Sequence, residues 1–278
     1  MGFEFLAGEV SEGCANCYAE TFAKRTGHNI WGPAATTQRR TFGDKHWQEP
    51  LKWHADAVKA GERRRVFCAS MADVFEQRPD LVEPRQRLFD LIAATPMLDW
   101  LLLTKRIHLV RKMLPKGYEL PAHVWIGTTV ENDEYARKRL KYLLELESPS
   151  VRFVSCEPLL GLPNLEPYLK RNARGIRVDW VIAGGESGHG SRPMDPAWPE
   201  ALQKQCAAAA VPFHFKQWGH WAPASNVELP HGFPASKVVH FYEGTHKIPV
   251  VSVGKNAAGR ILKGRTWDQF PVTRMTAA

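Results

Sequence analysis

Short apolar runs recur along residues 1–219 of the chain, and their starts lie about 24 to 34 residues apart, the length of one strand–helix unit. Each run is continuous rather than alternating, which is typical of strands buried on both faces of a parallel sheet. The six runs are Val66–Ser70, Trp100–Thr104, Val124–Thr128, Val151–Ser155, Trp180–Gly184 and Val211–Lys216.

The segments between these runs carry apolar residues at steps of three and four, as amphipathic helices do. The clearest are Leu81–Ala94, Asp133–Leu146 and Trp198–Ala210. Alternation of strands and helices predicts an α/β fold. We expect an incomplete (β/α) TIM-like barrel with parallel strands.

The pattern changes after Gly219, where prolines are frequent and helical spacing is weak. Residues 248–253 indicate a strand, and Gly259–Leu262 the start of another. Residues 266–271, with the sequence TWDQFP, are expected to anchor the end of the chain on the rest of the fold. We therefore expect a barrel domain over residues 1–219 and a C-terminal extension, residues 220–278, that packs on it.

The composition fits a globular protein, with 44% apolar and 24% charged residues in 278. The sequence has no apolar run long enough to span a membrane, and its first 20 residues lack the apolar segment of a secretory signal. A cytoplasmic location is therefore expected. The net charge of +8 indicates an anionic partner such as a nucleic acid, a nucleotide or a phosphate.

Charged side chains follow the predicted strands at the point where each strand ends. The carboxyl ends of parallel strands share one side of a sheet, which is where active sites lie. We therefore predict catalytic roles for Lys105, Glu157 and Glu186, and a cofactor-binding role for Asp73. Two structural interpretations compete: an ion pair of Lys105 with Glu157 or Glu186, and capping of the following helix by Asp73.

The segment Gly184–Gly190 holds four glycines directly after a predicted strand. Such a loop lets the backbone approach a ligand closely, and its N–H groups can hold a phosphate or a carboxylate. We predict that Gly184, Gly185, Glu186 and Ser187 bind a cofactor. The spacing matches neither common nucleotide-binding glycine motif, and a tight turn is the alternative reason for the glycines.

Tryptophans near the end of the last predicted strand are a further candidate. Trp218 and Trp221 lie close to Lys216 and are candidates for stacking on a base, with core packing as the alternative.

Cys14 and Cys17 form a C-x-x-C sequence, followed by Tyr18 and a predicted helix over Ala19–Arg25. Such a pair is found in zinc half-sites, redox pairs and iron–sulfur sites. The sequence has no second cysteine pair and no paired histidines to complete a zinc finger. A cluster site above the strand ends of a barrel fits the position of this pair better than a thioredoxin-like motif does.

Several segments together resemble a family of phage-associated proteins of unknown function that carry a three-cysteine, radical-SAM-like motif. They include SEGCANCYAE at 11–20, VFCASMADVFE at 66–76, VRFVSCEPLLG at 151–161 and DWVIAGGESGHGSRPM at 179–194. The resemblance implies a 4Fe–4S cluster and S-adenosylmethionine as cofactors, with Cys14 and Cys17 as metal ligands. It also places Tyr18 where an aromatic ring packs on the adenine, with packing at the start of the following helix as the alternative.

The sequence departs from the family motif at the first of its three cysteines. The family spacing places this cysteine at position 7, which is alanine here. The shorter spacing of many radical-SAM enzymes would place it at position 10, which is valine. Cys68 and Cys156, at predicted strand ends, are candidates for a replacement ligand. The alternative is that both are ordinary buried residues.

Three hypotheses of function follow. The first is a radical-SAM-like iron–sulfur enzyme that modifies a nucleic acid or a nucleotide. The second is a cluster-free, metal-dependent or hydrolytic barrel enzyme that uses Asp73, Glu157 and Glu186. The third is a non-catalytic protein that binds nucleic acid or a partner protein and has lost its cluster.

Overall fold

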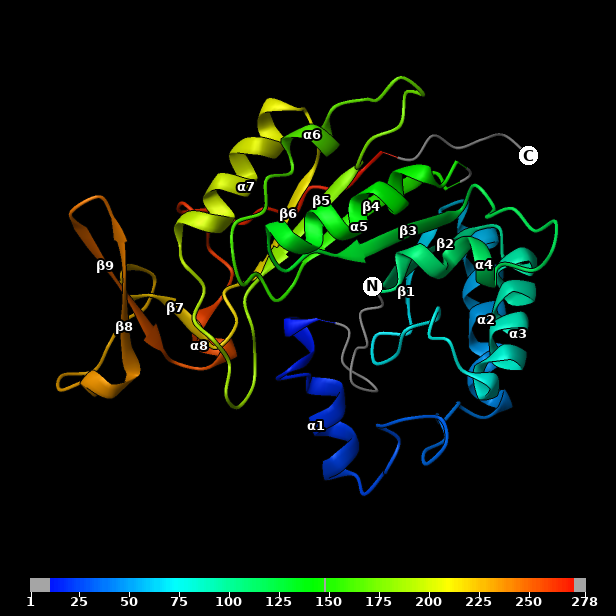
Figure 1. The fold of residues 1–278 in the computed structure, drawn as a ribbon, viewed down its shortest axis with the longest axis horizontal. Helices are drawn as coiled ribbons and strands as arrows, with labels where there is room; N and C mark the ends of the chain where they lie inside the picture. Colours follow the sequence, from blue (N-terminus) through cyan, green and yellow to red (C-terminus); the bar gives the residue numbers. More distant parts are fainter. Residues whose placement is uncertain (1–10, 148, 273–278) are drawn as a thin grey trace.

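A curled sheet of six parallel strands forms the centre of the molecule (Figure 1). The computed structural model describes residues 11–147 and 149–272. The strands pair in sequence order and make a half-barrel. They are β1 (Arg64–Cys68), β2 (Leu98–Thr104), β3 (Val124–Thr129), β4 (Val151–Cys156), β5 (Trp180–Gly184) and β6 (Phe213–Gln217). All six predicted strands are confirmed, with shifts of a few residues at their ends.

Helices cover the outer face of the half-barrel (Figure 1). The predicted helices are confirmed as α1 (Tyr18–Arg25), α3 (Val82–Ala94), α5 (Asp133–Glu145) and α7 (Ala197–Ala208). The structure adds α2 (Asp44–Ala60) and the short helices α4 (Val110–Met113), α6 (Glu166–Leu169) and α8 (Lys255–Ala258). The 3-10 turns are η1 (Glu12–Cys14), η2 (Pro79–Leu81), η3 (Ile107–Leu109), η4 (Ala224–Asn226) and η5 (Ala235–Lys237).

Two apolar clusters explain why the strands are apolar throughout. One lies between the sheet and the helices and includes Ile126 and Val154. The other lies on the opposite face and consists of Leu101, Trp125, Val151, Phe153, Trp180 and Ile182. Because successive side chains of a strand point to opposite faces, burial of both faces requires a continuous apolar run.

The C-terminal part forms a second sheet of three antiparallel strands in the order β7-β9-β8. Its strands are β7 (Trp221–Pro223), β8 (Val238–Glu243) and β9 (His246–Ser252), so the strand predicted at 248–253 is confirmed. The strand predicted to start at Gly259 is wrong. Gly259 and Lys263 have positive φ, and Leu262 makes only an isolated bridge to Arg265, because the chain turns there.

The predicted closing segment lies along β6, at one edge of the main sheet. Phe215 N–H donates to the carbonyl of Trp267, and Gln269 N–H donates to that of Phe213. The ring of Phe270 lies 4.9 Å from that of Trp180. The segment thereby covers the β6 edge, which would otherwise expose unpaired backbone groups.

The division of the chain at residue 219 stays a prediction. Ala222, Ala258 and Leu262 of the C-terminal part are buried in the same apolar cluster as the helices of the half-barrel. Among the described residues, no helix is long and apolar enough to cross a membrane.

A close contact in the centre of the sheet gives a test of this packing. Gly127 pairs with Phe153 across β3 and β4, and a Cβ atom on Gly127 would lie 2.4 Å from the Phe153 ring. We expect Gly127→Ala to lower the free energy of unfolding by about 1–3 kcal/mol, because the buried ring of Phe153 would have to shift to admit the methyl group. The measurement is urea denaturation.

Phe153→Leu supplies the control background, since the smaller side chain leaves room for the added methyl group. The cost of Gly127→Ala should be clearly smaller there. Equal costs in both backgrounds would contradict the packing described here.

Candidate functional site

Charged residues from five strands gather at the carboxyl-terminal edge of the half-barrel, which we call the rim. The rim consists of Asp73, Lys105, Glu131, Glu157 and Glu186, which follow β1, β2, β3, β4 and β5 in turn. Four of these residues were predicted from the sequence, and Glu131 was not. Each of the four carboxylates contacts a lysine or arginine side chain.

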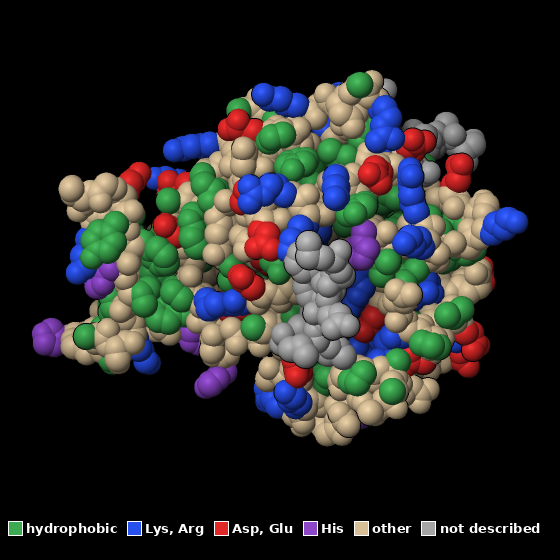
Figure 2. Space-filling view, in the orientation of Figure 1, with side chains coloured by type: hydrophobic (Ala, Val, Ile, Leu, Met, Phe, Trp, Pro, Cys, Tyr) green, Lys and Arg blue, Asp and Glu red, His purple; other side chains and the backbone are tan. Residues whose placement is uncertain are grey.

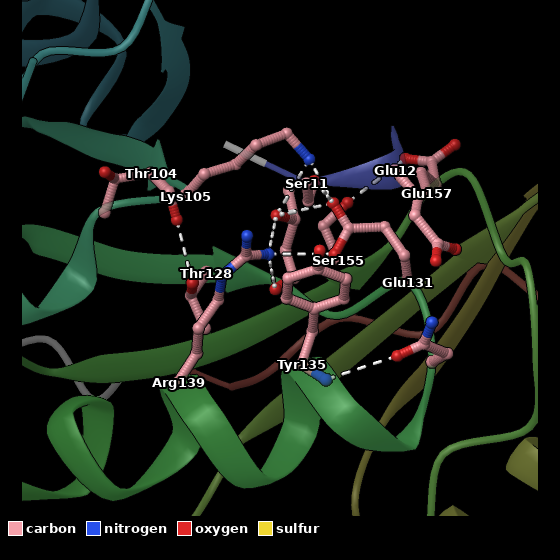
Figure 3. A network of polar contacts seen from close by, with 12 residues as sticks. Ser11, Glu12, Thr104, Lys105, Thr128, Glu131, Tyr135, Arg139, Ser155 and Glu157 are labelled. Carbon is pink, nitrogen blue, oxygen red and sulfur yellow. Dashed lines mark hydrogen bonds and ion pairs between the residues drawn. The ribbon is translucent and has the colours of Figure 1, made fainter. Parts of the chain in front are cut away.

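Glu131 is the most buried member of the rim, with none of its surface exposed. Figure 3 shows it within a network of polar contacts. Its carboxylate contacts Lys105 Nζ and lies 2.8 Å from a guanidinium nitrogen of Arg139 on α5. Ser11 Oγ donates a hydrogen bond of 2.5 Å to the same carboxylate. A buried charge needs such partners to offset its loss of hydration.

The charge state of Glu131 follows from these contacts. Burial by itself would raise the pKa of this carboxyl group, but Lys105 and Arg139 outweigh burial and hold its pKa at about 2. Glu131 is therefore an anion at neutral pH, and it is committed to structure rather than to proton transfer.

Glu186 is the second anchoring carboxylate. It accepts hydrogen bonds from the backbone N–H and the guanidinium of Arg192, at 2.8 and 2.6 Å. Asn16 Nδ2 donates to the same carboxylate at 3.0 Å. Burial would raise the pKa of Glu186, but these donors outweigh it and keep the pKa below its usual value.

Residues 11–17, which we call the cysteine loop, are held on the rim from two sides. Ser11 donates a hydrogen bond to Glu131 at one end of the loop, and Asn16 donates one to Glu186 at the other. Arg192 also donates to the carbonyl of Glu12 at 2.9 Å. Gly13 lies so close that a Cβ atom there would be 2.7 Å from the Glu131 carboxylate. The loop is therefore docked against the carboxyl ends of β3 and β5.

Both cysteines of this loop are half-buried free thiols. The predicted placement of the pair next to the strand ends agrees with this geometry. Tyr18 follows as the first residue of α1, and its hydroxyl donates to the carbonyl of Ser70, just after β1. Its side chain is 58% exposed, so Tyr18 ties α1 to the β1 side of the rim without being part of the core.

The remaining rim residues have structural partners of their own. Asp73 accepts from Thr104 Oγ1 at 2.7 Å and from Arg106 at 3.0 Å. It also accepts from the backbone N–H of Phe75 rather than capping α3, whose N-cap is Leu81, so that interpretation is wrong. Glu157 lies 3.3 Å from Lys216 of β6.

The predicted ion pair of Lys105 with Glu157 or Glu186 is also wrong, because Lys105 pairs with Glu131. These two residues follow neighbouring strands, whereas Glu157 and Glu186 follow strands further along the sheet.

The glycine-rich segment is shaped by contacts within the protein. A Cβ atom on Gly185 would lie 1.9 Å from the carbonyl oxygen of Trp218, and one on Gly184 would lie 2.5 Å from Glu157. Close packing against these segments therefore accounts for the lack of a side chain at both positions. Ser187 Oγ is buried and has no hydrogen-bond partner among the described residues. Its predicted role in cofactor binding stays a prediction.

The two tryptophans considered for base stacking both make contacts within the fold. Trp218 is buried, and its indole N–H donates to the carbonyl of Ile261. Trp221 donates to the carbonyl of Ser191.

The side chains that could ligate a metal lie apart from one another. Within residues 11–147 and 149–272, no three His, Cys, Asp or Glu side chains are grouped so that they could hold a metal ion. Cys68 and Cys156 pack with the apolar cluster under the helices rather than with the cysteine loop. Burial raises the pKa of the Cys68 thiol to about 12 and that of Cys156 well above its usual value, which disfavours a thiolate at either position.

The residues that sequence reasoning missed are those that hold the loop. Glu131 could have been found by the pattern that predicted the other rim residues, because it is also a charged residue that follows a predicted strand. Ser11, Asn16 and Arg192 carry no such signal, because their roles depend on contacts across more than a hundred residues of sequence.

The fold and the site together define an α/β half-barrel protein with a dithiol loop over the carboxyl ends of its strands. The chain belongs to the family described as protein of unknown function DUF5131, whose sequence model matches residues 7–271. No curated protein and no solved structure shows a match to the chain.

The Glu131 network gives a prediction on stability and pH. Glu131→Gln should lower the free energy of unfolding at pH 7 by about 3–5 kcal/mol, because Lys105 and Arg139 lose their buried counter-charge. Glu145→Gln, at an exposed position on α5, is the matched control and should change it by less than about 0.5 kcal/mol. Chemical denaturation measures both.

The pH dependence has a definite sign. The pKa of Glu131 is depressed in the folded state, so the unfolded state binds more protons at low pH. The stabilisation is present above the usual value of 4.5 and is lost as the pH falls toward about 2. Glu131→Gln should lack this part of the acid response. A variant with the wild-type acid response would contradict the assignment.

Proposed function

We propose that the chain is a radical-SAM-like iron–sulfur enzyme, built on a TIM-like scaffold, that modifies a nucleic acid or a nucleotide. One observation carries the proposal: the cysteine loop is docked on the carboxyl ends of a parallel half-barrel. Active sites of barrel enzymes lie at that edge. Cys14 and Cys17 are the two thiols available there.

The donor set supplies two of the three thiolates that such a cluster takes. Position 7, where the resemblance places the first cysteine, is alanine and lies outside the described residues, as does Val10. The other three cysteines pack in or against the core under the helices. Because the protein thiolates do not complete the set, we derive no reaction step through a cluster or through S-adenosylmethionine.

The side chains of the rim support an anionic substrate. Lys216, on β6 beside Glu157, is 56% exposed and is the most accessible of the paired cations at this edge. Arg192, with 36% of its side chain exposed, stands beside the cysteine loop. Both can contact a phosphate without breaking the buried pair of Lys105 and Glu131.

A cluster-free metal enzyme has less support. Asp73, Glu157 and Glu186 contact Arg106, Lys216 and Arg192 separately, and the described residues hold no grouped set of ligands. A carboxylate metal site would require these three side chains to leave their cationic partners.

Anaerobic reconstitution with iron and sulfide tests the proposal. We expect a visible absorbance band and bound iron in the wild type, and loss of both in Cys14→Ala and in Cys17→Ala. Cys206→Ala, on α7 and away from the rim, is the control and should keep the wild-type spectrum.

A wild-type protein that binds no iron in the complete natural chain would overturn the proposal. So would a spectrum that survives removal of both thiols of the cysteine loop.

A further inference from the structure

The β8–β9 hairpin projects away from the half-barrel (Figure 1). One of its faces turns to the body of the protein, where Phe241 meets Trp198 of α7 edge-on with the ring centres 6.2 Å apart. Ile248 lies opposite Phe241 in the register and shares this face. The hairpin therefore packs on α7 through the face that carries Phe241, and its opposite face does not take part in this contact.

The outer face presents a different set of side chains. Tyr242 lies opposite Lys247, and His240 lies opposite Pro249, so all four share one face of the hairpin. All four are exposed, and Tyr242 has 65% of its surface open to solvent. Figure 2 shows apolar, basic and histidine side chains gathered on this projecting end.

The charge of this end is positive. Residues 237–255 hold Lys237, Lys247 and Lys255 against a single carboxylate, Glu243. Glu243 lies opposite His246 on the inner face of the hairpin. Among the described residues, no hydrogen bond or ion pair involves the side chain of Lys247 or of His240, so both side chains are available to a ligand.

We propose that the outer face of the β8–β9 hairpin, residues His240, Tyr242, Lys247 and Pro249, binds single-stranded nucleic acid. Tyr242 stacks on a base, and Lys247 and His240 contact the neighbouring phosphates. An exposed ring beside cations on a sheet surface is the arrangement that binds single strands without sequence preference. The inference concerns a surface apart from the cysteine loop and does not depend on a cluster.

Single strands fit this surface better than duplex does. A stacked ring needs an unpaired base with an open face, and a duplex offers one only at its ends. An acidic protein segment would use the lysines but would leave the ring of Tyr242 without a role.

Fluorescence anisotropy with labelled oligothymidylate and oligouridylate tests this proposal on the full chain. The wild type should bind both probes, and the affinity should fall steeply as salt increases. Tyr242→Ala should weaken binding about tenfold, in line with loss of one stacked base. Lys247→Gln should weaken binding and reduce the salt dependence by about one phosphate contact.

Matched controls separate this surface from a general effect of charge. Phe42→Ala removes an equally exposed ring, and Lys170→Gln removes an exposed lysine, both away from the hairpin. Both should bind as the wild type does. Far-ultraviolet circular dichroism confirms that each variant is folded.

Wild-type affinity in Tyr242→Ala, or no binding of either probe at low salt, would overturn the proposal. Stronger binding of a duplex than of a single strand would also contradict it. These outcomes are distinct from those of iron reconstitution, because a chain that binds oligonucleotide but no iron leaves this inference intact.

Discussion

The structure around the rim depends on one buried negative charge, the carboxylate of Glu131. A carboxylate with no exposed surface is stable only when cations and hydrogen-bond donors surround it. Besides Thr129 at the end of β3, those donors are Lys105 after β2, Arg139 on α5, and Ser11 at the start of the cysteine loop. Pairing of one charge therefore fixes a strand end, a helix and a loop relative to each other.

The second anchor lies two strands further along the sheet. Glu186 binds Asn16 and Arg192, and Arg192 in turn binds the backbone of the cysteine loop. With an anchor at each end, the loop that carries Cys14 and Cys17 is held against the carboxyl ends of β3 and β5. The close approach of Gly13 to Glu131 shows why a larger residue would not fit at that position in the loop.

The sequence predicted the framework well, because continuous apolar runs at a regular spacing are characteristic of buried parallel strands and are uncommon elsewhere. The six strands and four of the helices follow from it. Convergence of the strand ends also followed from the parallel sheet, and it brought Lys105, Glu157 and Glu186 to one edge.

Which side chains pair with one another at that edge could not be predicted from the sequence. Lys105 pairs with Glu131, which follows the neighbouring strand, and the role of Ser11 depends on a contact 120 residues distant in sequence. The glycines after β5 were predicted as a ligand loop, which stays a prediction, and the close approach of Gly185 to the carbonyl of Trp218 was not predictable. The strand predicted from Gly259 was wrong because positive φ at Gly259 and Lys263 turns the chain.

The proposed function depends on the position of the two thiols, and that position depends on the two carboxylates. Hydrogen–deuterium exchange of the Cys14 and Cys17 amides tests this dependence most directly, since both donate hydrogen bonds within the loop. We predict slow exchange in the wild type and fast exchange in a variant with both Glu131→Gln and Glu186→Gln, while the amides of α7 stay protected. Unchanged exchange at both cysteines in a folded double variant would contradict the account.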